Sequence, residues 1–457
     1  MKLIYGIKDK PKFGQVIVFA IQQLLAIMAA TLVVPVIINT SGTMPEGAPA
    51  MSSAAALFGA GVGTLVYLLF TRFKSPVFLG SSFAFIGSMC AAFAGAVSAQ
   101  AGYLGLIIGA AFAGLVYVII ALIVKFAGVK WISKLMPAVV IGPTVAIIGL
   151  SLAGNAIGDL QTAPAGGSSY VAIICGLVTL AVTMLCATFG KKMVRLIPFI
   201  MGILAGYLTA TIFTVIGNVA SIDALKVINF APLTGLFTNF SVESIVSLPD
   251  FTFVEAFKGI KDIDGAFIGT VAVAYIPVAF VVFAEHIADH KNLSTIIEHD
   301  LLEEPGLHNT LLGDGVGSIA GAFFGGCPNT TYGESVGCVA ITGNASVVTI
   351  FTTAILAMVI SFLSPFVAFV NTIPSCVMGG VCMALYGFIA VSGLKMIQKV
   401  DLEKNRNLFV VSVILIAGIG GLTVSFGKVT LTAIACALIL GILTNLMLGI
   451  KDDKEEK

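Results

Sequence analysis

Charged side chains are scarce in this chain. Asp, Glu, Lys and Arg make up 10% of its 457 residues, whereas a soluble globular domain carries about 25%. So few charges cannot cover a water-exposed surface, which excludes a soluble globular protein. The formal net charge of +1 leaves no excess of either sign. It therefore gives no electrostatic argument for a nucleic-acid partner.

The spacings of metal sites and disulfide frameworks are also missing. None of the eight cysteines belongs to a Cys-x-x-Cys pair, and all of them fall in or beside apolar runs. Thiols in such runs behave as small hydrophobic groups. The sequence therefore predicts no disulfide framework, no metal site and no cofactor.

Long apolar runs are what the chain has instead. Hydrophobic residues make up 58% of it, and the mean hydropathy is +1.07. A helix needs about 20 apolar residues to cross a membrane, and runs of that length recur from end to end. A membrane β-barrel would alternate apolar and polar residues in short strands. The sequence therefore predicts an all-α polytopic membrane protein.

Fourteen apolar segments can be distinguished. The third and the tenth are the weakest as helices, because each opens with a Pro- and Gly-rich stretch. The first is too long for the apolar part of a signal peptide, so we expect it to be retained as a span. The segments cover approximately residues 14–38, 51–71, 80–98, 102–126, 134–153, 169–189, 196–217, 265–288, 309–324, 330–343, 346–369, 374–394, 407–425 and 429–450.

Lysine and arginine predict the orientation of these segments. If the N-terminus is cytoplasmic and the segments alternate, 20 of the 24 Lys and Arg residues fall on the inner side, as the positive-inside rule requires. The outer side then holds only Lys226, Lys258, Lys261 and Lys428. This asymmetry predicts an even number of spans in the cytoplasmic (inner) membrane, with both termini in the cytoplasm.

An internal repeat relates the two halves of the chain. Residues 136–142 and 373–379 both place Pro and Gly five apart before an apolar helix, seven segments apart. Residues 76–80 and 328–333 likewise precede the short third and tenth segments. Because seven is odd, the halves enter the membrane from opposite sides. Paired Gly- and Pro-interrupted segments in an inverted repeat are typical of a transporter's binding site.

Two carboxylates lie where the chain is otherwise apolar. Glu285 follows the apolar run Ala272–Ala284, and Glu334 follows the broken stretch Cys327–Gly333. A charge at bilayer depth costs about 2.5–3.5 kcal/mol, so such residues are rare and usually functional. Desolvation favours the protonated form of a carboxyl group, which suits proton-coupled transport. Two structural alternatives stay open: Glu285 in a hydrogen bond between helices, and Glu334 as the cap of its own short helix.

The two breaks supply groups that complement the carboxylates. Helices that begin near Gly333 and after Ser81-Ser82 present backbone N–H donors and a positive dipole end. Extended backbone at this depth is tolerated only where it is buried in protein or lines a polar cavity. Phe83, Phe85 and Tyr332 offer flat apolar walls. Acceptors, donors and flat walls together favour a small planar amide, such as a nucleobase, as the ligand.

Polar neighbours of Glu285 allow more than one interpretation. Asp289 lies four residues later, on the same helical face, and predicts either a proton relay toward the cytoplasm or the solvated end of the helix. His286 points to another face, where we expect it to pack or cap. Three more polar residues are expected at segment ends or in loops rather than in the site: His299, His308 and Asp314.

The motifs around these residues resemble those of the nucleobase–ascorbate transporter family, in particular its bacterial uracil permeases, over nearly the whole chain. The most specific motif is Pro328-Asn329-Thr330-Thr331-Tyr332-Gly333-Glu334, which continues as Ser335-Val336-Gly337 and then Thr342-Gly343. The other matching motifs are Leu79-Gly80-Ser81-Ser82-Phe83-Ala84-Phe85, Ala284-Glu285-His286-Ile287 and Pro305-Gly306-Leu307-His308.

The resemblance implies a fold and a domain division. The fold has fourteen spans in an inverted repeat of seven and seven, with short antiparallel strands in segments 3 and 10. Residues 1–130 and 265–370 would form a core domain, and residues 131–217 and 371–450 a gate domain. Residues 218–264 would form an extracellular loop and residues 451–457 a cytoplasmic tail.

The resemblance also implies partners and site residues. Members of the family are proton symporters and often dimers, so it implies a nucleobase, protons and the lipid bilayer as partners, and a homodimer. Glu285 and Asp289 would couple transport to protons. The positions that match the family's base-binding residues are Ala30, Phe83, Glu285, Tyr332, Gly333 and Glu334, with Tyr386 on the gate side.

Three departures from the family pattern concern the substrate and the proton route. Gln22-Gln23 stands where many members have Gln-His, and Ser335 replaces the signature Asn. Asp289 stands where uracil-type members can have a histidine and purine-transporting relatives often have Asp. Uracil uptake by alternating access is the favoured function, with a xanthine or other purine permease as the alternative.

Two other function classes are less well supported. An anion transporter of the same architecture would need positive charge at the site, and no Lys or Arg is expected at bilayer depth. A membrane enzyme would need facing catalytic aspartates or a Ser/His arrangement, and the sequence shows neither. We therefore expect a transporter rather than an enzyme.

Overall fold

Apolar helices dominate the structure, a computed structural model that describes residues 3–128, 137–163, 165–191, 193–238, 241–426 and 429–449. Backbone groups inside a membrane must be hydrogen-bonded within the protein, which a helix does within one segment. In the described ranges, helices long and apolar enough to cross a membrane are α1 (Phe13–Thr40), α2 (Ser53–Phe70), α4 (Ala99–Ala127), α6 with α7 (Ala138–Ser151 and Ala153–Gln161), α8 (Ser169–Phe189), α10 (Pro198–Val219), α13 (Gly265–Ile297) and α18 (Ser375–Ile397).

Shorter elements complete the bundle. The further helices are α3 (Ile86–Ala94), α9 (Met193–Leu196), α14 (Leu307–Gly325), α15 (Gly333–Thr342), α16 (Val347–Ile360), α17 (Ser364–Thr372), α19 (Asn405–Ile419) and α20 (Ala433–Gly449). The strands are β1 (Leu79–Ser81), β2 (Asn329–Thr331), β3 (Val424–Phe426) and β4 (Val429–Leu431). The 3₁₀ turn η1 (Phe83–Phe85) leads from β1 into α3, and the π turn η5 (Leu302–Gly306) precedes α14.

The expected class, a helical multi-pass membrane protein with short antiparallel strands in segments 3 and 10, is confirmed. Each of the fourteen expected segments contains at least one helix, while the number of membrane crossings and the inverted repeat stay predictions. Segment 346–369 is split into α16 and α17, because Pro365 lacks an N–H and stands in the first turn of α17. The hairpin of β3 and β4 was not predicted, since strands of three residues are too short for a visible alternation.

The connection between α10 and α13, which was expected to be an extracellular loop, contains only short helices in its described part. They are η2 (Asp223–Leu225), α11 (Ala231–Thr238), η3 (Val242–Ser244), α12 (Thr252–Lys258) and η4 (Ile260–Asp262). Several predictions fall outside the described residues: the tail 451–457, the start of the repeat motif at Met136, and the basic residues Lys2, Lys130, Lys134, Lys192, Lys428, Lys451, Lys454 and Lys457.

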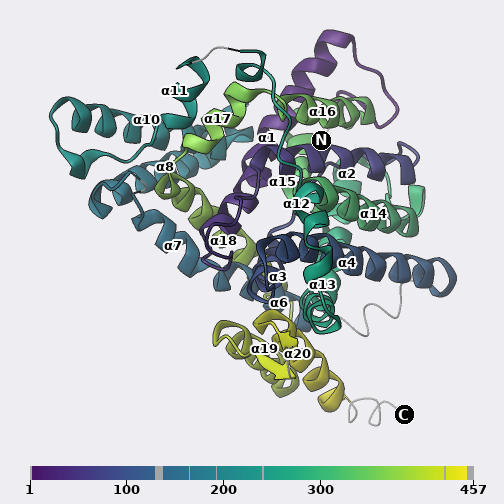
Figure 1. The fold of residues 1–457 in the computed structure, drawn as a ribbon. Coiled ribbons are helices and arrows are strands. Elements are labelled where there is room, and N and C mark those ends of the chain that lie inside the picture. The colour runs from purple at the N-terminus through teal and green to yellow at the C-terminus, as the bar shows by residue number, and fades with distance from the viewer. Residues whose placement is uncertain are drawn as a thin grey trace, which may run out of the picture.

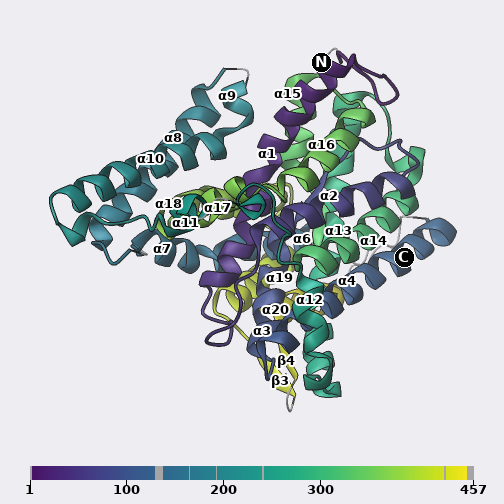
Figure 2. The same cartoon turned by 45° about the horizontal axis from the view of Figure 1, so that its top comes forward.

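The helices pack in two groups. In one, α2 and α4 lie against α14, α13 lies against α4, and α16 lies against α1 and α2. In the other, α18 lies against α6, α7 and α8, and α10 lies against α8. Figure 1 shows the second group as an arm of α7, α8, α10 and α18 to the left of α1, with α2, α4, α14 and α16 on the right. Figure 2 shows the hairpin of β3 and β4 next to α20.

Strands β1 and β2 pair where the two broken segments meet. They run antiparallel, with Leu79 opposite Thr331 and Ser81 opposite Asn329. The Asn329 side chain anchors β2 between α2 and α14: its Nδ2 donates to the Gly59 carbonyl at 3.1 Å. Any Cβ at Gly63 or Gly321 would lie 2.3 Å from that amide. Glycine at both positions is therefore what lets the strand enter the bundle.

Gly80 is expected to be intolerant of a side chain. A Cβ there would lie 2.3 Å from the Tyr332 ring. Overpacking should lower the free energy of unfolding of the Gly80→Ala variant by about 1–3 kcal/mol. The variant should therefore have a lower midpoint temperature of unfolding in detergent. Gly87→Ala is the matched control, because the nearest atom to its new Cβ is Ile434 Cδ1 at 3.7 Å. Equal midpoints for the two variants would contradict this account of the strand pairing.

Candidate binding site

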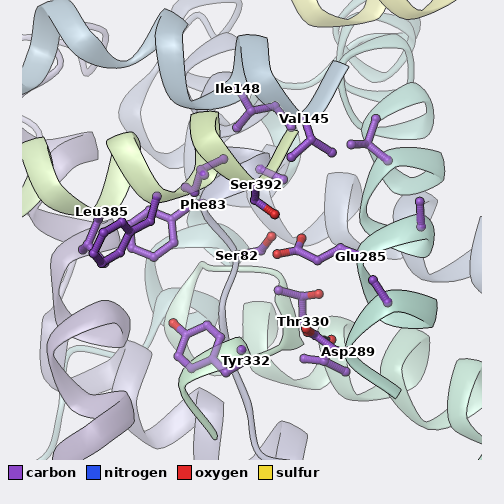
Figure 3. Close-up of a pocket in the computed structure, with 18 of the residues that line it drawn as sticks. Ser82, Phe83, Val145, Ile148, Glu285, Asp289, Thr330, Tyr332, Leu385 and Ser392 are labelled. Carbon is purple, nitrogen blue, oxygen red and sulfur yellow. Dashed lines mark hydrogen bonds between the residues drawn. The ribbon is translucent and has the colours of Figure 1, made fainter. Parts of the chain in front are cut away.

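A cavity of about 450 Å³ lies between the two groups of helices. Its walls come from the β1–α3 break, from α13, from the β2–α15 break and, across from these, from α6 and α18. Figure 3 shows how the side chains converge on it. Among its lining residues are Ser82, Phe83, Val145, Ile148, Glu285, Asp289, Thr330, Thr331, Tyr332, Gly333, Glu334, Leu385, Phe388 and Ser392.

Two short helices begin at this cavity without side-chain caps. No side chain caps the start of α15, where Tyr332 is the N-cap residue, or the start of η1, where Ser82 is. The first N–H groups of a helix have no partner within the helix, and they carry the positive end of its dipole. Residues from the starts of both helices line the cavity, so backbone donors are expected there from both broken segments.

Glu285 and Glu334 both face the cavity. Glu285 lies on α13 with its side chain largely exposed to the open space, and Glu334 is half-buried in the first turn of α15. Neither carboxylate makes a hydrogen bond or an ion pair to another described residue, but the Glu334 carboxylate accepts a hydrogen bond from its own backbone N–H in the first turn of α15. The interhelical hydrogen bond considered for Glu285 is therefore absent from the described contacts, whereas Glu334 does satisfy one N–H at the start of its own helix. Both carboxylates keep acceptor sites for a ligand, because a carboxylate can accept several hydrogen bonds.

Asp289 also lines the cavity, one turn along α13 from Glu285. Its Oδ2 accepts a hydrogen bond from Thr331 Oγ1 at 2.8 Å. A Cβ built at Gly333 would lie 3.9 Å from Asp289 Oδ1. The side chain is thus tied to the strand that leads into α15, and it does not mark a solvated helix end. Three acidic side chains, Glu285, Asp289 and Glu334, share one cavity.

Tyr332 contributes its ring and backbone rather than its hydroxyl. The hydroxyl donates to the Ser81 carbonyl at 2.8 Å and is 3.4 Å from Thr31 Oγ1. These bonds tie the start of α15 to β1 and to α1. The hydroxyl is therefore occupied within the protein, whereas the ring forms part of the cavity wall.

Two residues that the resemblance placed in the site do not line the cavity. Ala30 is 1% exposed on α1, one residue before the Thr31 that contacts Tyr332. Tyr386 is buried on α18, and its ring packs edge to face against Phe83 with centroids 6.4 Å apart. Both lie directly behind lining residues.

Three hydroxyl groups add polarity that the sequence reasoning did not assign. Ser82 and Thr330 come from the broken segments, and their hydroxyls have no hydrogen-bond partner among the described residues. Ser392 reaches the cavity from α18, and Figure 3 shows it beside Ser82 and Glu285. Ser82 and Thr330 belong to the two sequence motifs at the broken segments, so the sequence already placed them near the site. Nothing in the sequence around Ser392 distinguishes it from other helix residues.

Two departures from the family pattern contact each other. Gln23 Nε2 donates to Ser335 Oγ at 2.5 Å, and Ser335 Oγ also accepts from the Phe78 backbone N–H at 3.2 Å. Both side chains are buried. The pair therefore joins α1, α15 and the entry to β1 in a single contact, immediately behind Glu334.

Asp314 was expected at the boundary of its segment, and that expectation is wrong. Its side chain is buried in α14 and lies 2.6 Å from His286 Nδ1. The sequence could not show this, because the two residues are 28 positions apart on different helices. His286 packs away from the cavity, as expected. His299 lies in the turn after α13, where its Nε2 is 3.1 Å from the Glu304 carbonyl.

Comparisons with known proteins agree with this architecture. A family model described as the permease family matches residues 14–426. The uracil permease of Bacillus caldolyticus is 37% identical over 450 residues, which cover 98% of this chain and 95% of that protein. The uracil permease of Escherichia coli K12 is 34% identical over 442 residues, which cover 96% and 92%.

Among solved structures, the transmembrane domain of the cyanobacterial bicarbonate transporter BicA superposes with a TM-score of 0.58. The match covers 96% of this chain and 99% of that domain, at 14% identity. A likeness at such low identity shows the fold alone. The family match and the relatives show more: the chain belongs to the permease family that includes the bacterial uracil permeases.

Proposed function

We propose that this protein carries a nucleobase, preferentially uracil, into the cell together with protons. One observation carries the proposal: Glu285 and Glu334 face a single cavity, bonded to no other described residue, beside the starts of two short helices whose N-cap side chains make no cap. The curated names of its relatives support uracil as the substrate. A volume of about 450 Å³ is within the range of about 300–1,000 Å³ that is usual for small-molecule sites.

Uracil has a chemistry that matches the cavity. Its ring N–H groups need acceptors, and carboxylates are strong acceptors. Its carbonyl oxygens need donors, which N–H groups in the first turns of α15 and η1 would provide. We assign Glu334 and Gly333 to hold the base, with the Phe83 and Tyr332 rings covering its faces. Ala30 and Tyr386 would support these residues from behind.

Proton coupling is assigned to Glu285 and Asp289. Three acidic groups in one cavity repel each other when all are ionised. Binding a proton at Glu285 removes part of that repulsion, and the neutral acid gains an O–H donor for a substrate carbonyl. Asp289, held by Thr331, would pass the proton on toward the cytoplasmic end of α13. Substrate and proton would thus favour each other's binding.

The two groups of helices support alternating access, with α1–α4 and α13–α16 as the core domain and α6–α10 with α18–α20 as the gate domain. The cavity reaches Ile141 near the start of α6 and Met396 near the end of α18, the ends that the charge distribution assigns to the cytoplasm. Elsewhere along the interface Thr40 of α1 lies 3.5 Å from Asp159 of α7. We infer an inward-open state in the inner membrane, with cytoplasmic termini and a homodimeric assembly.

Two alternatives are tested by the same experiment. A purine permease stays open as an alternative because Ser335 departs from the family signature and purine-transporting relatives often have Asp at the position of Asp289. An anion transporter shares the fold, but among the described residues no Lys or Arg lines the cavity. An acid-lined cavity would repel an anion.

Purified protein in liposomes should accumulate labelled uracil when an inward proton gradient is imposed. An uncoupler should abolish the accumulation. Unlabelled uracil should compete best in a panel that also contains xanthine, hypoxanthine and thymine. If xanthine competes more strongly than unlabelled uracil, the preferred substrate is a purine rather than uracil. Uptake that ignores the uncoupler would contradict proton coupling.

A further inference from the structure

A buried polar network lies on the side of α13 that faces away from the cavity. His286 and His290 are both fully buried there, with their rings stacked at a centroid distance of 4.0 Å. His286 Nδ1 lies 2.6 Å from Asp314 Oδ2, and its Nε2 lies 3.0 Å from Thr310 Oγ1, both on α14. None of these side chains lines the cavity, so the proposed transport mechanism does not use them.

The second histidine connects the network to α2. His290 Nδ1 lies 2.8 Å from the His286 carbonyl oxygen, which can only accept, so Nδ1 carries the proton. In the neutral ring Nε2 is then an acceptor, and the Tyr67 hydroxyl donates to it at 2.7 Å. Ser75 in turn donates to Tyr67 at 2.7 Å. Every donor and acceptor in this branch has a consistent direction.

The same reasoning places a proton between His286 and Asp314. The Thr310 hydroxyl donates to the Leu307 carbonyl at 3.0 Å, so it accepts from His286 Nε2. With Nε2 protonated, Nδ1 and Asp314 Oδ2 at 2.6 Å must share a further proton. Without it, two lone pairs would face each other at that distance.

The charges around Asp314 support the same assignment. Among the described residues, His286 is the only basic group within 4 Å of its carboxyl group. A buried carboxylate without a positive partner is strongly disfavoured. The proton makes the pair neutral overall, whichever of the two residues holds it.

We propose that His286 and Asp314 form a neutral pair that keeps one shared proton through the transport cycle and fixes the rotation of α13. Glu285 and His286 are adjacent, so their side chains leave the helix on different faces. His290 and Asp289 repeat this one turn later. Tying the histidines to α14 and α2 therefore holds the two acids toward the cavity. His286 and Asp314 are positioning residues, distinct from the groups that contact substrate.

The Asp314→Asn variant tests the shared proton. Asparagine donates an N–H to His286 Nδ1, as the protonated acid would, but it cannot ionise. An unfolded histidine titrates near pH 6.5 and an unfolded Asp near pH 4. Above about pH 6.5 the native parent pair holds one proton more than the unfolded chain, so its thermal midpoint should fall as the pH rises. In the variant the buried histidine is neutral, so its midpoint should instead fall as the pH drops below about 6.5.

Other titrating groups cancel in this comparison because both proteins contain them. Tyr117 of α4, Tyr67 of α2 and His290 face the pair, and Glu285, Asp289 and Glu334 lie on the cavity side of α13 and in α15. Parallel curves for parent and variant over pH 5 to 9 would overturn the shared proton. This measurement needs no substrate, so it stands apart from the proposed function.

Uracil binding and uptake test the positioning role, and this arm rests on the proposed function. Asp314→Ala should weaken uracil binding about tenfold or more, since small misplacements of a binding group are costly. Asp314→Asn should restore both the affinity and the parent's dependence of uptake on pH. Ser318→Ala, a buried serine one turn along α14, is the matched control. If Asp314→Asn folds and binds uracil but loses proton-driven uptake, the pair transfers protons and the static role is wrong.

Discussion

The Glu334→Ala variant is expected to lose uracil binding. Its carboxylate faces the cavity in the first turn of α15 and is bonded to no other described residue. Each hydrogen bond to a charged group contributes about 1.5–3 kcal/mol, which corresponds to about 10- to 150-fold in the dissociation constant. Asp289, the next acid, is already bonded to Thr331 and does not replace the lost acceptor. Equilibrium binding of labelled uracil to purified protein measures the effect.

A surface carboxylate provides the control for this change. Glu303→Ala removes an exposed acid from the turn before α14 and should leave uracil affinity unchanged. Thermal midpoints of both variants would show that each is folded. Uracil affinity of the Glu334→Ala variant within threefold of the parent would mean that another group holds the base.

The Glu285→Gln variant is expected to separate uracil binding from proton movement. Glutamine keeps the size and one acceptor oxygen of the side chain, but it cannot take up a proton. Because Glu285 faces the cavity beside Asp289, its charge is the one that substrate-linked protonation would neutralise. We expect exchange of labelled for unlabelled uracil to continue, with affinity reduced less than tenfold, and accumulation driven by a proton gradient to disappear.

Comparison with Asp289→Asn makes this second experiment specific. Asparagine can still accept the Thr331 hydrogen bond, so the strand contact survives while the titratable group is lost. Slower but still concentrative uptake is expected if Asp289 relays the proton that Glu285 binds. Proton-driven accumulation by Glu285→Gln at the parent's rate would remove Glu285 from the coupling mechanism.

Much of the fold follows from patterns that are local in the sequence. Apolar runs of spanning length specify helices, because a backbone in lipid must satisfy its own hydrogen bonds. Asp264 and Ser98 mark helix starts by accepting bonds from Phe267 and Ala101, a typical capping chemistry. The Pro- and Gly-rich stretches before Gly80 and Gly333 predicted the strands and the short helices that follow them. The helix starts that line the cavity could thus be predicted.

The partners across helices could not be predicted. Asp314 looked like a boundary residue, yet it pairs with His286. Gln23 and Ser335 looked like two independent departures, yet they are hydrogen-bonded to each other although 312 positions separate them. Spacing along one chain carries no information on which faces of distant helices meet.

Glu285 and Glu334 illustrate what the sequence determines and what only the tertiary structure determines. The sequence by itself determined that both carboxylates lie in apolar surroundings and that Glu334 follows a helix break, because hydropathy and breaks are read residue by residue. Only the tertiary structure decided that they share one cavity with Asp289. The pairing of β1 with β2 and the anchoring of α13 by its histidines bring these side chains together. Both are long-range contacts, which form only when the whole bundle is packed.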